Sequence, residues 1–334
     1  DIGTYYMTNK TCPFTRSILE RSMEGGYNFL SAMFSSETCQ MMHRAHEYFD
    51  IMGLVKEQNP DFFLSMMDVP FVTTKAAYEH YENQLRKHIL EPLEKVYGVD
   101  ISDKAIRAAI GEHNEICDII SELGELRKLP NPPITSYEFH VLQLVSECCP
   151  QYLIKDKLLE TLKEVRKRKV DPKTNYRARL VVTGSEVDDP AFTKLLEDCG
   201  VYVVADRYCF GSFPSREQIE IKEGETAFDA IVRHYLHWNQ CARFMEGAKI
   251  DQRHAEVKRL VDEFHADGVI YENMKFCEFW SYEKVLANHI FTNEKHIPCC
   301  TIEKEYSLGA VGQLRTRFQA FIESLEIKSI QGGK

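Results

Sequence analysis

The sequence predicts an α/β protein built from two parallel-sheet domains, and three observations point to this fold class. Short apolar runs alternate with helical segments near both ends of the chain, as in parallel sheets whose strands are connected by helices. The middle of the chain instead has long segments with apolar residues at helical spacing. The length of 334 residues is sufficient for two domains. We therefore expect an N-terminal α/β domain over residues 1–72, a helical segment over 73–176 and a C-terminal α/β domain over 177–334.

The N-terminal domain is predicted from two apolar strands. The aromatic and apolar run after Gly25 and Gly26 predicts a buried strand, and an apolar run that ends at Pro70 predicts a second one. Pro13 favours the first turn of a helix, because the N–H groups of that turn have no partner within the helix and proline lacks this group. Few elements precede Cys12, so we expect the domain to be incomplete at its start. The expected elements are a helix from residue 13, a strand over 27–34, a helix over 39–52 and a strand over 62–70.

The middle segment predicts helices alone. Ser102 and Thr135 are plausible N-cap residues, and the prolines of Pro130-Asn131-Pro132-Pro133 interrupt the helical pattern. The expected helices cover residues 75–97, 103–126, 136–147 and 152–169.

The C-terminal domain alternates between strands and helices, which implies a parallel sheet. We expect its strands over residues 179–183, 201–205, 268–271 and 297–302. The expected helices cover residues 190–199, 227–245, 253–265, 281–288 and 309–325.

Composition and charge exclude several classes of function. The formal net charge of −10 argues against nucleic-acid or anionic-membrane binding. No apolar run reaches the length of a membrane span, and no leader pattern is present, so we expect a cytoplasmic protein. Eleven cysteines are many for such a chain, and its ample apolar core makes a disulfide scaffold unnecessary. Metal or redox chemistry is the better interpretation, although there is no Cys-x-x-Cys pair and no P-loop motif.

Three thiols have positions that favour a shared site. Cys39 and Cys277 each follow a predicted strand, and Cys12 lies just before a helix start. Ligands of open α/β sheets bind outside the carboxyl ends of strands, so these thiols are expected to point into one crevice. Their spacing does not resemble a zinc site, whereas the ligands of an iron–sulfur cluster can come from distant loops.

Three further cysteines are candidate ligands. Cys148 and Cys149 stand where a helix ends before Pro150, and Cys209 follows the predicted strand over 201–205. The alternative interpretation is that Cys148 and Cys149 pack against the helical segment and that Cys209 lines a pocket. Four more residues are candidates for substrate binding and proton delivery, from their positions alone: Ser185, Glu186, Arg207 and His43.

Several short motifs follow one another along the chain: Thr11-Cys12-Pro13-Phe14-Thr15-Arg16-Ser17, Thr38-Cys39, Lys275-Phe276-Cys277, Ile297-Pro298, Glu305-Tyr306-Ser307 and Gly312-Gln313-Leu314-Arg315-Thr316-Arg317-Phe318-Gln319-Ala320-Phe321. In these motifs and their order, the sequence resembles the 2-hydroxyacyl-CoA dehydratase and benzoyl-CoA reductase family, in its cluster-carrying subunit. The resemblance covers nearly the whole chain, and the three-cysteine set is its most specific part.

This resemblance implies two Rossmann-like domains with a [4Fe–4S] cubane held by Cys12, Cys39 and Cys277. The additional thiols of Cys148, Cys149 and Cys209 make the chain most similar to the double-cubane branch, in which two cubanes share a sulfide as an [8Fe–9S] cluster. That branch implies a homodimer, a separate ATP-hydrolysing iron–sulfur activator protein and low-potential reduction of a small molecule. Two alternatives stay open at this point: a one-cubane subunit of an acyl-CoA dehydratase or aryl-CoA reductase, and a non-enzymatic iron–sulfur electron carrier.

Overall fold

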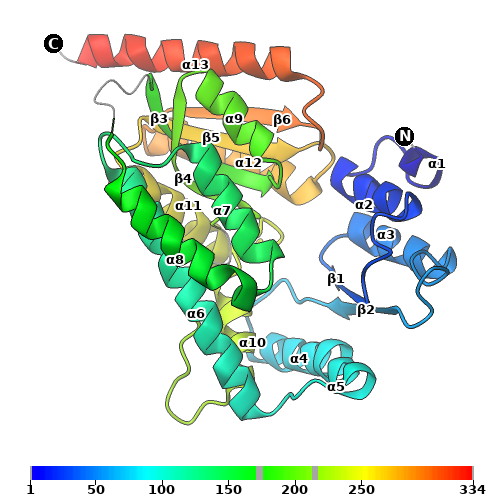
Figure 1. The fold of residues 1–334 in the computed structure, drawn as a ribbon. Coiled ribbons are helices and arrows are strands. Elements are labelled where there is room, and N and C mark those ends of the chain that lie inside the picture. The colour runs from blue at the N-terminus through cyan, green and yellow to red at the C-terminus, as the bar shows by residue number, and fades with distance from the viewer. Residues whose placement is uncertain (1, 171–175, 213–216, 333–334) are drawn as a thin grey trace. The chain divides into compact units, whose positions relative to one another are not determined.

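The chain forms two compact units, each with its own parallel sheet. The computed structural model describes residues 2–170, 176–212 and 217–332 (Figure 1). Unit 1 comprises Asp1–Ile110 and Ile219–Glu246, and unit 2 comprises Gly111–Gln218 and Gly247–Lys334. The predicted domain boundaries after residues 72 and 176 both stay predictions. The second boundary lies next to residues 171–175, which are outside the described residues. The expected mixed α/β fold with parallel sheets is confirmed.

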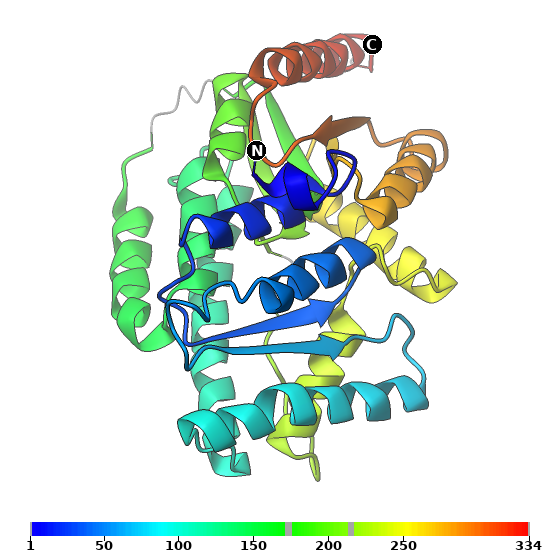
Figure 2. The ribbon, with the colours of Figure 1, turned by 90° about the vertical axis from the view of Figure 1, so that its right-hand side faces the viewer.

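Unit 1 contains a sheet of two parallel strands, β1 (Ala32–Glu37) and β2 (Phe63–Asp68). Helices α2 (Pro13–Met23) and α3 (Gln40–Ile51) lie on one side of these strands, and α4 and α5 lie on the other (Figure 2). A short helix, α1 (Gly3–Tyr6), precedes them. The core between the strands and α2 and α3 includes the fully buried side chains of Leu19 and Phe49.

The first predicted strand is wrong in its first half. Residues 27–31 form turns, and β1 begins only at Ala32. Gly25 adopts a left-handed backbone with φ +78°, and the N–H groups of Asn28 and Leu30 bond to carbonyls three residues earlier. Tyr27 and Leu30 still pack against the core, but from a turn, so their apolar pattern resembles that of a strand.

The remaining helices of unit 1 form a second core. A continuous helical stretch comprises α4 (Lys75–Leu85), a π-helical segment (Arg86–Leu90) and α5 (Glu91–Tyr97). Helix α10 (Ala227–Trp238), far along the chain, packs against α4 around Tyr81 and Phe228. The predicted helix over 227–245 ends early because the Asn239 side chain accepts a hydrogen bond from the Cys241 N–H at 2.9 Å, which closes a local turn.

Unit 2 contains a four-stranded parallel sheet in the order β4-β3-β5-β6. The strands are β3 (Ala178–Glu186), β4 (Val201–Cys209), β5 (Gly268–Met274) and β6 (Cys299–Lys304). The helices around them are α9 (Pro190–Asp198), α11 (Gly247–Glu263), α12 (Glu278–His289) and α13 (Val311–Gly332). On one face of the sheet, Leu180, Val182 and Ile270 pack in a core with residues of α9 and α13. Helices α11 and α12 contact β3 and β5, and Tyr271 packs against Trp280 of α12.

Three long helices build a further apolar cluster in unit 2: α6 (Asp103–Glu125), α7 (Ser136–Cys148) and α8 (Gln151–Lys167). The division between the two units falls within α6. Thr135 begins α7 with a reciprocal capping box to Glu138, as its sequence position suggested. No helix in the described ranges is long and apolar enough to span a bilayer.

Candidate metal centre

The three cysteines singled out by the sequence share one structural role, because each is the N-cap residue of a helix. Cys12 begins α2, Cys39 begins α3 and Cys277 begins α12. At Cys39 the sulfur itself accepts the Met42 N–H at 3.4 Å. All three thiols are half-buried. The backbone N–H groups at a helix N-terminus suit a negatively charged group, such as a metal bound through thiolates.

These thiols are divided between the units: Cys12 and Cys39 belong to unit 1 and Cys277 to unit 2. Their convergence on one cluster therefore stays a prediction. In the part of the chain that the structure describes, no group of three or more His, Cys, Asp or Glu side chains could hold a metal ion. Thiols at helix N-termini are nevertheless the donor type that an iron–sulfur group requires, so this ligand chemistry fits.

The carboxyl edge of the unit 2 sheet brings further candidates together. Cys209 is the last residue of β4 and pairs in register with Glu186, the last residue of β3. The Val187 N–H donates to the Cys209 carbonyl at 3.4 Å. Cys277 follows β5, which is the other neighbour of β3. Cys209 and Cys277 thus come from the two strands that flank β3.

Cys148 and Cys149 lie at the C-terminal end of a helix, unlike the three N-cap cysteines. Cys148 is the last residue of α7, Cys149 is its C-cap, and both side chains are exposed. Partial burial of the Cys148 sulfur, and the nearby carboxylates of Glu147 and Asp188, raise the pKa of this thiol. Asp188 belongs to the loop after β3, so the end of α7 faces that loop. This environment disfavours a bare thiolate, and a bound cation would be needed to keep it ionised.

Ser185 and Glu186 are adjacent but have different surroundings. Ser185 is 3% exposed, and its Oγ donates to a Glu272 carboxylate oxygen at 2.9 Å and accepts the Met274 N–H at 2.6 Å. Its hydroxyl therefore joins β3 to β5. Glu186 has a buried Oε1 without a hydrogen-bond partner among the described residues. Burial, and the charges of Asp188 and Glu272, raise the pKa of Glu186 well above its ordinary value.

Arg207 is buried inside unit 2. Burial lowers its pKa, although a guanidinium stays charged, and its Nη1 donates to the Ser212 carbonyl at 3.4 Å. The neighbouring Asp206 forms a buried ion pair with Arg127 at 3.0 Å. Arg207 and these two residues line a cavity of about 180 Å³. Strand β4 was predicted to end at residue 205. It continues to Cys209 because Asp206 and Arg207 stay in register with Val182 and Thr183 of β3, and the buried Asp206 carboxylate has Arg127 as its partner.

His43 lies in unit 1, close to the cap at Cys39. Its Nδ1 bonds to Glu37 Oε1 at 2.8 Å, and its Nε2 lies 3.4 Å from a Glu47 oxygen. The carboxyl end of β2 repeats this arrangement, because Asp68 bonds to His80 Nε2 at 2.8 Å. Two carboxylate–histidine pairs thus stand at the edge where β1 and β2 end.

Sequence reasoning missed Arg243 at the same edge. This side chain is 8% exposed and lies over the Phe71 ring, 5.3 Å from its centroid. The ionisable groups that interact with it are Cys241, Asp68, Cys39 and Glu37. The available signal was a charged residue between the apolar Ala242 and Phe244, soon after a helix.

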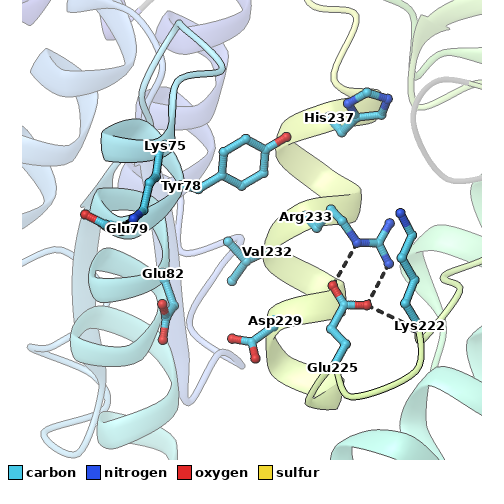
Figure 3. A pocket seen from close by; sticks show the side chains of 10 residues that line it. All are labelled: Lys75, Tyr78, Glu79, Glu82, Lys222, Glu225, Asp229, Val232, Arg233 and His237. Carbon is cyan, nitrogen blue, oxygen red and sulfur yellow. Dashed lines mark hydrogen bonds and ion pairs between the residues drawn. The ribbon is translucent and has the colours of Figure 1, made fainter.

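A cavity of about 560 Å³ in unit 1 lies between α4 and α10 (Figure 3). Arg233 Nε bonds to Glu225 at 2.8 Å, and the Lys222 N–H donates to the same carboxylate at 3.0 Å. Acidic and basic side chains occur in similar numbers, so the cavity has no clear preference for one charge. None of the predicted site residues lines it; its lining is Lys75, Tyr78, Glu79, Glu82, Lys222, Glu225, Asp229, Val232, Arg233 and His237.

Comparison with known proteins gives a consistent result over the whole chain. The family model described as 2-hydroxyglutaryl-CoA dehydratase, D-component, matches residues 1–325. The (R)-phenyllactyl-CoA dehydratase beta subunit of Clostridium sporogenes is 23% identical over 94% of this chain and 80% of its own length. A benzoyl-CoA reductase subunit of Thauera aromatica is 22% identical over 98% of this chain and 82% of its own length.

A third relative is the lactoyl-CoA dehydratase beta subunit of Anaerotignum propionicum, which is 23% identical over 96% of this chain and 82% of its own length. The resemblance found in the sequence motifs is thereby confirmed at the level of the family. Because the family model covers nearly every residue, the chain belongs to the 2-hydroxyacyl-CoA dehydratase family, in its 2-hydroxyglutaryl-CoA dehydratase D-component group.

Proposed function

We propose that this chain is an iron–sulfur oxidoreductase that carries an [8Fe–9S] double-cubane cluster and reduces a small molecule at low potential. The observation that carries the proposal is the placement of cysteines at the carboxyl ends of strands in both units. Cys12, Cys39 and Cys277 are helix N-caps, so each thiol lies beside the N–H groups of a first helical turn. Together they would ligate the first cubane.

The second cubane would be held by Cys148, Cys149 and Cys209. Cys209 pairs with Glu186 across β4 and β3, and Cys148 faces Asp188 in the loop that follows. These contacts support a common location at one edge of the unit 2 sheet. The pKa of Cys148 is raised in this environment, so a cationic iron group would favour ionisation of its thiol.

The cluster, when bound, supplies electrons, and the residues of the chain would manage binding and protons. Glu186 is the best candidate proton donor, because burial favours its neutral carboxylic acid and its Oε1 has no hydrogen-bond partner among the described residues. Ser185 would position β5 beside it through Glu272. Arg207 and His43 are proposed to bind substrate, one from each unit.

Partners follow from the same proposal. The relatives are named as subunits of dehydratases and of a reductase, which supports assembly with other chains. We propose a homodimer that receives electrons from an ATP-hydrolysing iron–sulfur activator protein. None of the eleven cysteines, all within the described ranges, forms a disulfide, which agrees with a reducing cytoplasm.

A second candidate function is a subunit of a 2-hydroxyacyl-CoA dehydratase or benzoyl-CoA reductase with a single [4Fe–4S] cluster. The names of the relatives favour it. A non-enzymatic electron carrier is the third candidate, and turnover with an activator and ATP distinguishes it from the other two.

Iron counting on the Cys149→Ser variant tests the proposal. Anaerobically purified wild-type protein should hold about eight iron atoms, and the variant about four, since a second cubane loses a ligand. Cys299→Ser is the matched control: burial raises the pKa of Cys299 to about 12, so it should remain a thiol and its loss should leave iron unchanged. About four iron atoms in both wild type and Cys149→Ser would favour the single-cluster alternative, and no iron in the wild type would contradict both.

A further inference from the structure

We propose that the guanidinium of Arg243 donates hydrogen bonds to an anion bound beside Cys39, and that this anion is the thiolate-ligated iron–sulfur group. The inference rests on the proposed function, and it assigns to Arg243 the role of stabilising the negative charge of the cluster. Three features of the structure support it: the burial of Arg243, its lack of a carboxylate partner among the described residues and the identity of the groups that face it.

The burial of Arg243 calls for a partner. The side chain is 8% exposed, and its Nη1 is buried without a hydrogen-bond partner among the described residues. A guanidinium has five N–H donors, and leaving a buried charged donor unsatisfied is costly. The contact with the Phe71 ring, at 5.3 Å, stabilises the cation but accepts no hydrogen bond in the plane of the guanidinium.

Two other buried arginines of the chain, Arg127 and Arg253, show the expected arrangement. Arg127 has an Asp206 oxygen at 3.0 Å, and Arg253 has a Glu283 oxygen at 2.7 Å. Arg243, in contrast, has no carboxylate within ion-pair distance in the described part of the chain. An arginine buried to this extent without an acidic partner is typical of a site that receives a negative group from outside the chain.

The groups around Arg243 identify where that negative group would lie. Phe71, which Arg243 covers, follows the end of β2, and the last residues of β1 and β2, Glu37 and Asp68, are in register. The ionisable side chains that influence Arg243 include Cys241, on its own loop, and Asp68, Cys39 and Glu37 from this edge. Each of the two carboxylates already bonds to a histidine, at 2.8 Å. The anion for Arg243 is therefore expected at the thiols, and Cys39 is the one that begins a helix at this edge.

A fixed cation next to a thiolate-ligated cluster has a predictable consequence. Reduction adds a negative charge to the cluster, so a neighbouring guanidinium stabilises the reduced state more than the oxidised state. Removing the cation should shift the one-electron equilibrium towards the oxidised state by at least about tenfold, which corresponds to a midpoint potential about 59 mV more negative. The substitution Arg243→Lys keeps the positive charge but not the planar set of hydrogen-bond donors, so it should shift the midpoint potential less than Arg243→Gln does.

The test compares wild-type protein with Arg243→Gln, Arg243→Lys and the control Arg86→Gln, all purified anaerobically. Arg86 is a suitable control because it belongs to the same unit, lies 4.7 Å from the Phe228 ring centroid and already has a carboxylate partner, Glu82, at 3.2 Å. Iron content is measured first. A redox titration followed by electron paramagnetic resonance then gives the midpoint potential of each protein.

We expect wild type and Arg86→Gln to share one potential, Arg243→Gln to be more negative by about 59 mV and Arg243→Lys to lie between them. Loss of iron from Arg243→Gln with retention in Arg243→Lys would also support the inference. Equal iron and equal potential in Arg243→Gln and Arg86→Gln would overturn it while leaving the proposed function intact. Wild-type protein without iron would overturn the proposed function, and this inference with it.

Discussion

Glu272 should make the stability of unit 2 depend on pH. Its carboxylate lies in the centre of the sheet, 0% exposed, and accepts hydrogen bonds from the Ser185 N–H at 3.0 Å and the Ser185 hydroxyl at 2.9 Å. Lys304 Nζ lies 3.8 Å from its other oxygen. Burial raises the pKa of Glu272 to about 7, although Lys304 and Ser185 oppose the shift.

The size and sign of the effect follow from linkage. Because the folded state holds the proton more tightly than the unfolded state, the stability from this group is complete below the ordinary pKa of 4.5 and is lost as the pH rises through about 7. One pKa unit corresponds to about 1.4 kcal/mol, so the loss across this interval is about 3 kcal/mol. The substitution Glu272→Gln replaces the acid with a neutral isostere that does not titrate.

The assay follows the unfolding of unit 2, and comparison with the Gln variant subtracts the contribution of all other titrating groups. The sequence has two tryptophans, so in a Trp238→Phe background only Trp280, which is 5% exposed in unit 2, reports unfolding in urea. The free energy of unfolding of the Glu272 protein, minus that of its Gln variant, should fall by about 3 kcal/mol between pH 4.5 and 8. A difference that is constant over this range would show that the carboxyl ionises as in water, and would refute the argument.

Substitutions at four further positions test other parts of the structure. Gly184→Ala should lower the free energy of unfolding by about 4 kcal/mol or more, because a Cβ there would overlap the backbone carbonyl of Glu272. Gly111→Ala has open space around it in α6 and should raise the free energy of unfolding by about 1 kcal/mol. Urea titration of both variants measures the difference. Glu283→Ala should cost about 3–5 kcal/mol by leaving a buried charge network without its anion, and unchanged stability would contradict this. Thr135→Ala removes the cap of α7 and should cost about 1 kcal/mol, with Thr135→Ser restoring most of it.

The elements that sequence analysis predicted well are those with local determinants. Pro13 specifies the start of α2, and the Thr135 cap specifies that of α7. Strands β3, β4 and β5 were located correctly because they are buried along nearly their whole length, so their sequences are apolar runs. For the same reason the end of β4 was misjudged: Asp206 is polar, but it is buried by Arg127, which is 79 residues away in the chain.

The candidate site shows the same limit. The helix-cap position of Cys39 follows from a strand, a cysteine and a helical pattern in succession, all of which are visible locally. Arg243 could not be placed in this way, because its significance depends on burial and on neighbours from β1 and β2, more than 170 residues earlier. No pattern of spacing indicates that a guanidinium will lack a carboxylate in the folded chain.

The discontinuity of unit 1 has a consequence for biosynthesis. Tyr81 of α4 is buried against Phe228 of α10, yet the segment Gly111–Gln218 separates them in the chain. A ribosome that adds about 5–20 residues per second needs about 5–20 s to make that segment. During this interval the apolar face of α4 has emerged without its partner helix, so nascent chains that stall before residue 227 should be bound by chaperones and cleaved by proteases near α4.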